Sequence, residues 1–317
     1  MFDQNKLTNI LIKLYCLTPL FIQEKSLKLI KIMFPIRFSM LEKRIMVINY
    51  FKLNHANDGE MLSILNFIKK NIYIFFPYDF TRKYNAKEIQ VYTDRESKMN
   101  YVLHNNKRLY FPVKRTQQEI RDIYIELLAE QDPESPHLYE TSTFHVEDGD
   151  VILDVGAAEG IFTLNNIEKI KKSYLFEYED EWIEPLKETF KPWSEKITIV
   201  KKYVTDVSDN DSIKLDDFQV DKVNFIKADI EGAETQLLTG AKKLLQNQDG
   251  LKIAICTYHN QNDGEKINKT LNDLGFECEF SNAYMIYIYN EQFNPPYLRK
   301  GLIRAKKINI KNTHCNL

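Results

Sequence analysis

Several features that mark other classes of protein are missing from this 317-residue sequence. It has no run of 18 or more apolar residues, so it predicts no membrane-spanning helix. Its four cysteines form neither a C-x-x-C pair nor a zinc-ligand spacing, which favours free thiols in a reducing cytoplasm and argues against a structural metal. The 43 basic and 45 acidic residues nearly cancel, so we expect no global attraction to nucleic acid.

The remaining composition predicts a globular chain with four parts. Hydrophobic residues make up 44% of it, enough at this length for one large α/β domain and a smaller one. A turn signal at residues 147–150 precedes a run of β-branched and apolar residues, so we place the main domain at residues 148–295. Before it we expect a helical region at residues 1–85 and a lead-in at 86–147, and after it a basic tail at 296–317.

The first 47 residues are basic and interrupted by short apolar blocks. They contain eight Lys or Arg and three Asp or Glu. No continuous apolar core and no small-residue cleavage site follow, so the segment is not a signal peptide. We expect helices that pack as a cap, and docking on a membrane surface or on a partner protein is the alternative. The predicted location is therefore cytoplasmic, with peripheral attachment to a membrane left open.

The lead-in carries signals for a hairpin, a helix and a loop. Asn105-Asn106 is a typical turn between strands at residues 99–103 and 108–111. Residues 116–130 then have the pattern of one helix. The polar, proline-broken stretch from Gln131 to His137 follows, and we expect it to fold as a lid over the main domain.

Strand and helix patterns alternate through the main domain. This rhythm predicts a Rossmann-like α/β fold, in which helices cover both faces of a parallel sheet. The last two strands are separated only by Asn282-Ala283 and must therefore be antiparallel, so the sheet should end in an antiparallel C-terminal hairpin. The predicted strands are 151–156, 173–179, 197–205, 223–230, 251–258, 276–281 and 284–290, and the predicted helices are 160–171, 181–190, 233–246 and 264–274.

The first predicted strand runs into a small-residue turn at the sheet edge where ligands of such folds bind. Gly156 and Gly160 let the backbone approach a ligand, and the following helix N-terminus supplies unpaired N–H groups. Ala158 stands where a dinucleotide fingerprint has its middle glycine, which disfavours pyrophosphate. A turn that binds nothing is the alternative. The candidate cofactor-binding residues of this turn are Asp154, Gly156, Ala157, Glu159 and Gly160.

The next two strands supply further candidates for cofactor binding. Glu177 ends the second strand, 23 residues after Asp154, where a carboxylate accepts hydrogen bonds from ribose hydroxyls. Tyr178 follows it directly. After the third strand, Thr205 and Asp206 are candidates for contact with an adenine amino group.

Candidates for catalysis follow the fourth and fifth strands. Asp229 and Glu231 point to the same side of the strand end because side chains alternate along a strand. Glu234 is expected to act mainly as a favourable charge at a helix N-terminus. His259, after the fifth strand, and His137, in the loop before the domain, have side chains that suit base chemistry near neutral pH. A hydrogen-bonded structural role is the alternative for each histidine.

These motifs together resemble the FkbM family of methyltransferases. The resemblance covers residues 130–290 and rests on Asp154-Val155-Gly156-Ala157-Ala158-Glu159-Gly160, on Leu175-Phe176-Glu177, and on Lys227-Ala228-Asp229-Ile230-Glu231-Gly232-Ala233-Glu234. It implies a class I methyltransferase fold, S-adenosylmethionine as methyl donor, and O-methylation of a hydroxyl on a sugar or natural product. Tyr178 stands where members usually have proline, and residues 1–85 have no counterpart in the core domain.

Within this resemblance, Asp229, Glu231, His259 and His137 are the candidate catalytic residues. Asp229 is placed to hold the sulfonium or the amino group of the methionine moiety, which makes it a cofactor-binding candidate as well. Asp229 itself, Glu231, His259 and His137 are the candidates for the base that takes the proton of the acceptor hydroxyl. Magnesium bound by Asp229, Glu231 and a histidine is an alternative way to polarise that hydroxyl, although we assign no metal.

The sequence predicts an O-methyltransferase acting on a small-molecule or glycan acceptor, and two other classes of function compete with it. One is a non-catalytic module of the same fold that partners a glycan-assembly enzyme. The other is a nicotinamide dehydrogenase, which Ala158 and the terminal hairpin oppose. Residues 297–317 contain six Lys or Arg and no Asp or Glu, so an acidic acceptor or lipid is a possible attraction for the tail.

Overall fold

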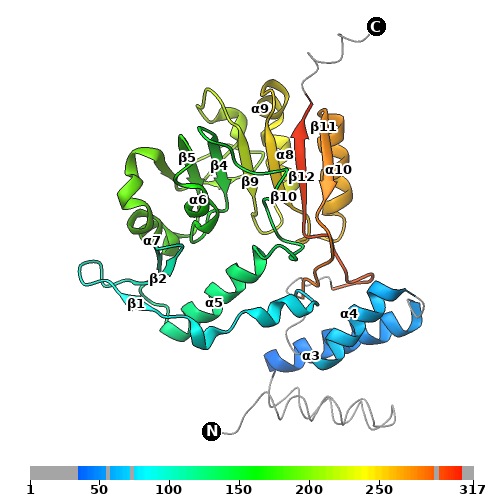
Figure 1. Cartoon of the computed structure of the whole chain (residues 1–317). Coiled ribbons are helices and arrows are strands. Elements are labelled where there is room, and N and C mark those ends of the chain that lie inside the picture. Colours follow the sequence, from blue (N-terminus) through cyan, green and yellow to red (C-terminus); the bar gives the residue numbers. More distant parts are fainter. Residues whose placement is uncertain (1–34, 55–57, 72–74, 289–292, 309–317) are drawn as a thin grey trace. The chain divides into compact units, whose positions relative to one another are not determined.

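The computed structural model describes residues 35–54, 58–71, 75–288 and 293–308. The chain divides into two compact units (Figure 1). The smaller comprises Met1–Asp79 and Met285–Leu298, and the larger comprises Phe80–Tyr284 and Arg299–Leu317. The basic segment at residues 1–34 and the end of the predicted tail, 309–317, lie outside the described residues. No helix in the described part of the chain is both long and apolar enough to cross a membrane.

The described part of the smaller unit includes helices α3 (Pro35–Asn54) and α4 (Gly59–Lys70), within the segment predicted to be helical. Asp58 caps α4 by accepting a hydrogen bond from the backbone N–H of Met61 at 3.1 Å. Apolar residues of both helices are buried, among them Phe51 of α3 and Ile64 of α4. The backbone N–H of Ile286 donates to the carbonyl of Phe75 at 3.0 Å, which ties the segment after Tyr284 to this unit.

The boundary between the units falls at the start of η1 (Asp79–Lys83), and η2 (Ala86–Glu88), a three-stranded antiparallel sheet and a helix follow in the larger unit. Asn105 and Asn106 have φ of 49° and 63°, the left-handed conformation of a two-residue hairpin turn, which confirms the predicted turn. Thr116 and Glu119 form a capping box at the start of the helix. The elements are β1 (Tyr92–Thr93), β2 (Asn100–His104), β3 (Lys107–Phe111) and α5 (Gln117–Glu130).

A seven-stranded sheet forms the centre of the larger unit, in the order β11-β12-β10-β9-β4-β5-β6 (Figure 1). Five strands are parallel, and the terminal pair β11 and β12 is antiparallel, which confirms the predicted α/β class. The parallel strands are β4 (Val151–Val155), β5 (Lys172–Phe176), β6 (Ile197–Val200), β9 (Phe225–Ala228) and β10 (Lys252–Cys256), and the pair is β11 (Phe276–Phe280) and β12 (Leu302–Lys307).

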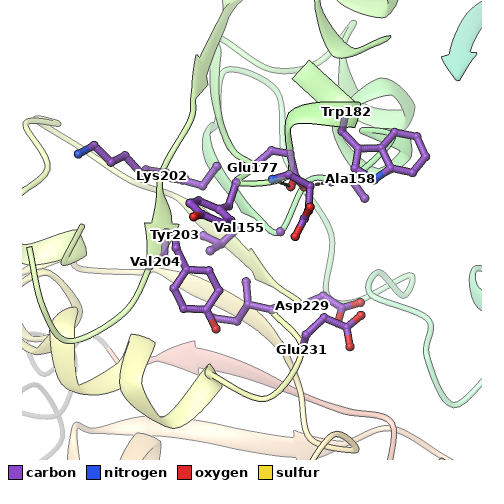
Figure 2. Close-up of a pocket in the computed structure, with 14 residues that line it drawn as sticks. Val155, Ala158, Glu177, Trp182, Lys202, Tyr203, Val204, Asp229 and Glu231 are labelled. Atoms are coloured by element: carbon purple, nitrogen blue, oxygen red, sulfur yellow. Dashed lines mark hydrogen bonds between the residues drawn. The ribbon is translucent and has the colours of Figure 1, made fainter. Parts of the chain in front are cut away.

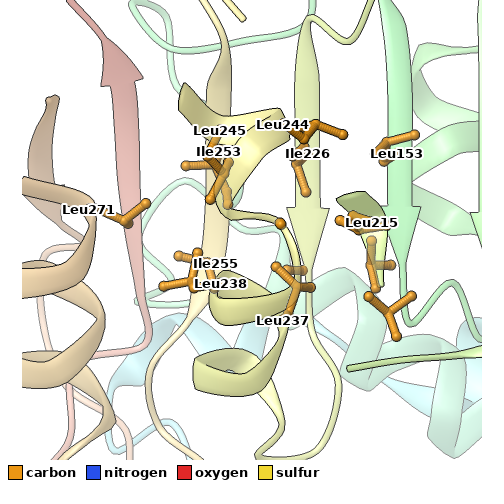
Figure 3. Packing of buried hydrophobic residues seen from close by; sticks show 14 of the residues in the cluster. Leu153, Leu215, Ile226, Leu237, Leu238, Leu244, Leu245, Ile253, Ile255 and Leu271 are labelled. Atoms are coloured by element: carbon orange, nitrogen blue, oxygen red, sulfur yellow. The ribbon is translucent and has the colours of Figure 1, made fainter. Parts of the chain in front are cut away.

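Helices cover the sheet because the central strands are apolar on both faces. Figure 3 shows Ile226, Ile253 and Ile255 of the central strands packed with leucines of the helices that follow β9 and β10. Short elements β7 (Tyr203–Val204) and β8 (Ser212–Ile213) form a separate parallel pair. The helices are α6 (Ile161–Asn166), α7 (Asp180–Phe190), η3 (Lys191–Lys196), η4 (Leu215–Asp217), α8 (Glu234–Gly240), α9 (Lys242–Asn247) and α10 (Asp263–Asp273).

The second strand of the predicted C-terminal hairpin, residues 284–290, was predicted wrongly. Residues 284–290 do not form the strand beside β11, because Met285 and Ile286 are buried in the smaller unit. Instead β12 returns from the smaller unit and lies between β11 and β10. Residues 302–307 were assigned to a basic tail, yet Leu302, Ile303 and Ala305 are fully buried. Basic composition concealed an internal strand, since Arg304, Lys306 and Lys307 make up half of its six residues.

Three element boundaries also differ from the predicted ones. The predicted strand at residues 197–205 is two elements, since β6 ends at Val200 and Tyr203–Val204 pairs with β8. The predicted helix at 160–171 ends at Asn166, and the one at 233–246 breaks at Ala241. Apolar residues follow each of these breaks, so periodicity alone does not locate them.

Candidate functional site

A pocket of about 260 Å³ opens at the carboxyl ends of β4, β5 and β9 (Figure 2). This is the edge where ligands of open α/β sheets bind. Most of its wall comes from the residues that directly follow these strands and β6. The lining residues are Val155, Gly156, Ala158, Phe176, Glu177, Tyr178, Glu179, Trp182, Lys202, Tyr203, Val204, Asp229, Ile230 and Glu231.

The glycines of the turn after β4 are needed for packing within the protein. Gly156 has φ of 72°, and a Cβ there would lie 1.8 Å from the carbonyl oxygen of Asp229. Gly160 has φ of 81°, and a Cβ there would lie 2.8 Å from atoms of Leu186 and Phe190. Both glycines were expected to let the backbone approach a ligand, and Gly160 does not line the pocket. Gly156 does line it, and it also lets β4 and β9 end close together.

Three other residues predicted in this turn are buried behind the pocket wall. Asp154 accepts a hydrogen bond from Thr163 Oγ1 at 2.8 Å and lies 3.4 Å from Lys227 Nζ. Ala157 and Glu159 are also buried, and burial raises the pKa of Glu159 to about 8. Asp154, Ala157 and Glu159 therefore support the turn without lining the pocket.

Glu177 is held firmly at the tip of β5. Its side chain is 7% exposed, with Oε2 accepting from the N–H of Ala158 and Oε1 from the N–H of Glu179, both at 2.7 Å. Burial raises its pKa above the ordinary value, against the lowering effect of these backbone hydrogen bonds. A carboxylate anchored in this way keeps lone pairs free to accept further hydrogen bonds from a ligand in the pocket.

Aromatic rings form the outer wall beside Glu177. Tyr178 is 46% exposed, and its ring meets that of Tyr203 edge to face with centroids 6.2 Å apart. Trp182, from the first turn of α7, completes this wall (Figure 2). The sequence had drawn attention to Tyr178 but not to Trp182 or Tyr203.

Thr205 and Asp206 do not reach the pocket. Thr205 Oγ1 donates to Asp206 Oδ1 at 3.1 Å, and Gly240 packs against the Thr205 backbone. Because β6 ends at Val200, the residues that meet the pocket are Lys202 and Tyr203. Lys202 and Tyr203 could have been found from the sequence only if the end of the third strand had been placed at Val200.

Asp229 lies at the inner side of the pocket within a cage of polar side chains. Tyr139 Oη donates to Oδ2 at 2.8 Å, and His137 Nε2 lies 3.3 Å from the same oxygen. Tyr258 Oη and His259 Nε2 approach Oδ1 at 3.4 and 3.5 Å. Burial alone would raise the pKa of Asp229, but the hydrogen bond from His137 and the nearby positive charges lower it, so the carboxylate stays ionised.

His137 is part of this cage and not of a surface lid. Its side chain is 1% exposed, and its ring lies 5.0 Å from that of Tyr139 and 5.4 Å from that of Tyr258. The preceding loop is tied to the domain, since Asp132 accepts a hydrogen bond from Tyr84 Oη at 2.6 Å. The structure therefore shows a packed segment where the sequence predicted a lid, because its polar residues find partners within the protein.

His259 and Glu231 lie on the other side of Asp229. His259 Nδ1 is 2.8 Å from Glu234 Oε1, and Nε2 is 3.7 Å from Glu231 Oε2. Burial lowers the pKa of His259, but the hydrogen bond to Glu234 and the charges of Asp229, Glu234 and Glu231 raise it to about 9. Glu231 lines the pocket with an 82% exposed side chain (Figure 2).

Glu234 has a different position from the one predicted for it. A carboxylate that serves only the helix dipole stays in water, whereas Glu234 is fully buried. Its Oε1 accepts from the backbone N–H of Ile230 at 3.1 Å as well as approaching His259. Tyr139, Tyr258 and Glu234 were missed as site residues because their contacts with Asp229 and His259 join distant parts of the sequence.

Two groups in the described part of the chain bring possible metal ligands within 4.8 Å of one another: His137, Asp229 and Cys256, and Asp229, Glu234 and His259. Glu231 belongs to neither, so the magnesium alternative loses one of its predicted ligands. In the second group the two carboxylates face opposite nitrogens of one imidazole and cannot share an ion with it. The contacts within both groups are explained by hydrogen bonds and ion pairs, and we assign no metal.

The sheet order and the site define a Rossmann-like class I methyltransferase fold: a parallel sheet ending in an antiparallel pair, with an anchored carboxylate at the tip of its second strand. Residues 56–278 match the profile of the family described as the methyltransferase FkbM domain. The chain belongs to this family, which confirms the resemblance seen in the sequence. The match begins at residue 56, so residues 56–85, which the sequence left without a counterpart, belong to it as well. Its members depend on S-adenosylmethionine, and this confirms the expected cofactor.

Solved structures resemble parts of the chain at low sequence identity. An FkbM methyltransferase from Methylobacillus flagellatus KT is 17% identical over 60% of this chain, with a TM-score of 0.42, and the chain spans 53% of its length. A putative S-adenosylmethionine-dependent methyltransferase from Listeria monocytogenes is 12% identical, with 58% of this chain and 100% of that chain covered and a TM-score of 0.39. No curated protein sequence matches the chain.

Proposed function

We propose that this protein transfers a methyl group from S-adenosylmethionine to a hydroxyl group of a sugar or glycan precursor. One observation carries the proposal: the pocket places the anchored carboxylate of Glu177 and the exposed carboxylate of Glu231 on the same cavity. The first suits a ribose and the second suits an acceptor hydroxyl. The net charge of −2 supports a small-molecule or glycan acceptor over nucleic acid, and free Cys256 and Cys278 suit the cytoplasm.

The residues of the pocket fit the cofactor in three places. Glu177 would accept hydrogen bonds from the ribose hydroxyls, since both its oxygens are already oriented by backbone N–H groups. Tyr178 and Tyr203 would contact the adenine ring. Asp229, kept ionised by its cage, would attract the positive charges of the methionine moiety.

Glu231 is the residue best placed to act as the base. S-adenosylmethionine, when bound, supplies an electrophilic methyl carbon: its bond to sulfur breaks while a bond to the acceptor oxygen forms, and the hydroxyl proton must leave. His259 already carries a proton at neutral pH, and the lowered pKa of Asp229 makes it a weak base. The Glu231 carboxylate is exposed to the pocket mouth and can accept the proton.

Calorimetric titration with S-adenosylmethionine and with NADH tests the cofactor. We expect saturable binding of S-adenosylmethionine alone, weakened by Glu177→Ala and unchanged by Glu184→Ala, whose exposed side chain pairs with Lys187 on α7. Binding of NADH would overturn the cofactor assignment. Binding of neither compound would support the alternative of a non-catalytic module that partners a glycan-assembly enzyme.

Glu231→Gln tests the reaction itself. The amide keeps the shape of the side chain but cannot take a proton, so methyl transfer to a glycan acceptor should fall by about 10²- to 10⁴-fold. Binding of S-adenosylmethionine, followed by calorimetry, should stay close to that of the parent protein. Unchanged turnover would remove Glu231 from the mechanism.

A further inference from the structure

A buried acidic residue next to the site has no role in the mechanism above. Glu234 is the first residue of α8 and has an exposed fraction of 0%. Its Oε1 atom accepts from the Ile230 N–H at 3.1 Å and lies 2.8 Å from His259 Nδ1. Burying a carboxylate is costly unless the charge is matched. Glu234 therefore joins the turn after β9 to the segment after β10.

His259 links Glu234 to the two carboxylates of the pocket. One ring nitrogen faces Glu234, and the other lies 3.5 Å from Asp229 Oδ1 and 3.7 Å from Glu231 Oε2. A neutral imidazole donates from only one nitrogen, whereas an imidazolium donates from both. A charged ring can therefore donate to the carboxylates on both sides. A neutral ring would leave the negative charges of three neighbouring carboxylates without a positive charge between them.

The ring is fixed by its own surroundings. It is 3% exposed and lies against Tyr258, with ring centroids 4.1 Å apart. Arg299 Nη1 donates to the backbone carbonyl of His259 at 2.8 Å. Asp229 and Glu231 from the turn after β9, Glu234 from α8 and the ring of Tyr258 thus face the imidazole, and Arg299 binds the backbone carbonyl.

The turn that carries Glu231 adopts a conformation that needs support. Glu231 has φ of 54° and Gly232 has φ of 102°, and the left-handed region is unfavourable for a residue with a side chain. The hydrogen bond from Ile230 to Glu234 holds one end of the turn. At the other end, Asn260 Nδ2 donates to the carbonyl of Gly232 at 3.1 Å. The turn is therefore held from α8 and from the segment after β10.

We propose that Glu234 and His259 form a positioning pair, in which the buried carboxylate orients a charged imidazole that in turn fixes Asp229 and Glu231. The pair acts through these two carboxylates and neither member contacts the acceptor or the methyl donor. The inference rests on the proposed function, because it concerns the placing of its base. It assigns His259 a supporting role in place of the base chemistry considered from the sequence.

Glu234→Gln tests the pair, since the amide still accepts from Ile230 but cannot balance a charged ring. We expect the pKa of His259, measured by nitrogen NMR without cofactor, to fall in the variant. Turnover should drop by about tenfold to a hundredfold because the base is displaced, with little change in the Kd of S-adenosylmethionine. The alkaline side of the pH profile should move to lower pH. Glu265→Gln, at an exposed acidic residue of α10, is the matched control.

The NMR result separates this inference from the proposed function. If no acceptor is methylated by the parent protein, the pKa of His259 in parent and Glu234→Gln still decides whether the two residues are coupled. An unchanged pKa of His259, or full turnover with an unaltered pH profile, overturns the pair. If Glu234→Gln does not fold, His259→Gln removes the charge from the same cluster, and the same loss of turnover with retained cofactor binding is expected.

Discussion

Gly156 illustrates how a single residue sets the geometry of the pocket. Gly156→Ala would place a Cβ 1.8 Å from the Asp229 carbonyl oxygen, at a φ of 72°. We expect the free energy of unfolding, measured by chemical denaturation, to fall by well over about 1 kcal/mol. Gly149→Ala is the control, because Gly149 has φ of 82° and no atom near its Cβ position. Equal losses in the two variants would mean that backbone strain, not the close approach of β4 and β9, sets the requirement.

Tyr178 is a second single residue of interest, because it stands where members of the family usually have proline. Its exposed ring meets Tyr203 at the pocket wall, so a ligand ring placed there would have an aromatic neighbour. Tyr178→Ala should raise the Kd of S-adenosylmethionine by roughly two- to tenfold in a calorimetric titration, the value of one aromatic contact. Tyr92→Ala, at an exposed residue of β1, should leave the Kd unchanged.

At the scale of elements, the hairpin β2–β3 depends on a turn that its own residues favour. Asn105 and Asn106 are both left-handed, and a β-branched side chain is strongly disfavoured in that region. Asn106→Val should destabilise the larger unit by about 1 kcal/mol or more in thermal or chemical unfolding, while Asn106→Gly should be tolerated. A tolerated valine would show that the flanking strands, and not the turn, fix the hairpin.

Elements with local signals were predictable, and those defined by distant partners were not. The hairpin, helix α5 and the parallel strands follow from turn residues, caps and apolar patterns within about 15 residues. The partner of β11 is β12, which the chain reaches only after passing through the smaller unit. The nearest apolar segment, 284–290, was the natural but wrong choice, because pattern and spacing do not reveal which distant strand completes a sheet.

At the scale of the whole molecule, stability should depend on pH through groups whose pKa is raised by folding. The pKa of His259 is raised to about 9 and that of Glu159 to about 8, so the folded protein binds more protons than the unfolded chain. The contribution of His259 is complete below its ordinary pKa near 6.5 and is lost as pH rises toward 9. The free energy of unfolding should therefore fall between these pH values.

Urea denaturation at several pH values, followed by the fluorescence of Trp182 and Trp193, measures this dependence in the larger unit, which contains both tryptophans of the chain. His259→Gln should reduce the fall in stability between pH 6.5 and 9, by up to about 3 kcal/mol relative to the parent. An identical slope in parent and variant would show that folding does not raise the pKa of His259.

The sequence alone determined the alternation of strands and helices, the family and the turn after β4, and it placed Glu177, Asp229 and Glu231 at the carboxyl edge of the sheet, because each of these depends on neighbours close in the chain. The tertiary structure decided what surrounds them. His137 and Tyr139 from one segment and His259 from another meet around Asp229 only in the folded protein, and Glu234 of α8 contacts His259 there. Their charges and burial, which set which carboxylate can take a proton, are properties of that packing and of no single stretch of sequence.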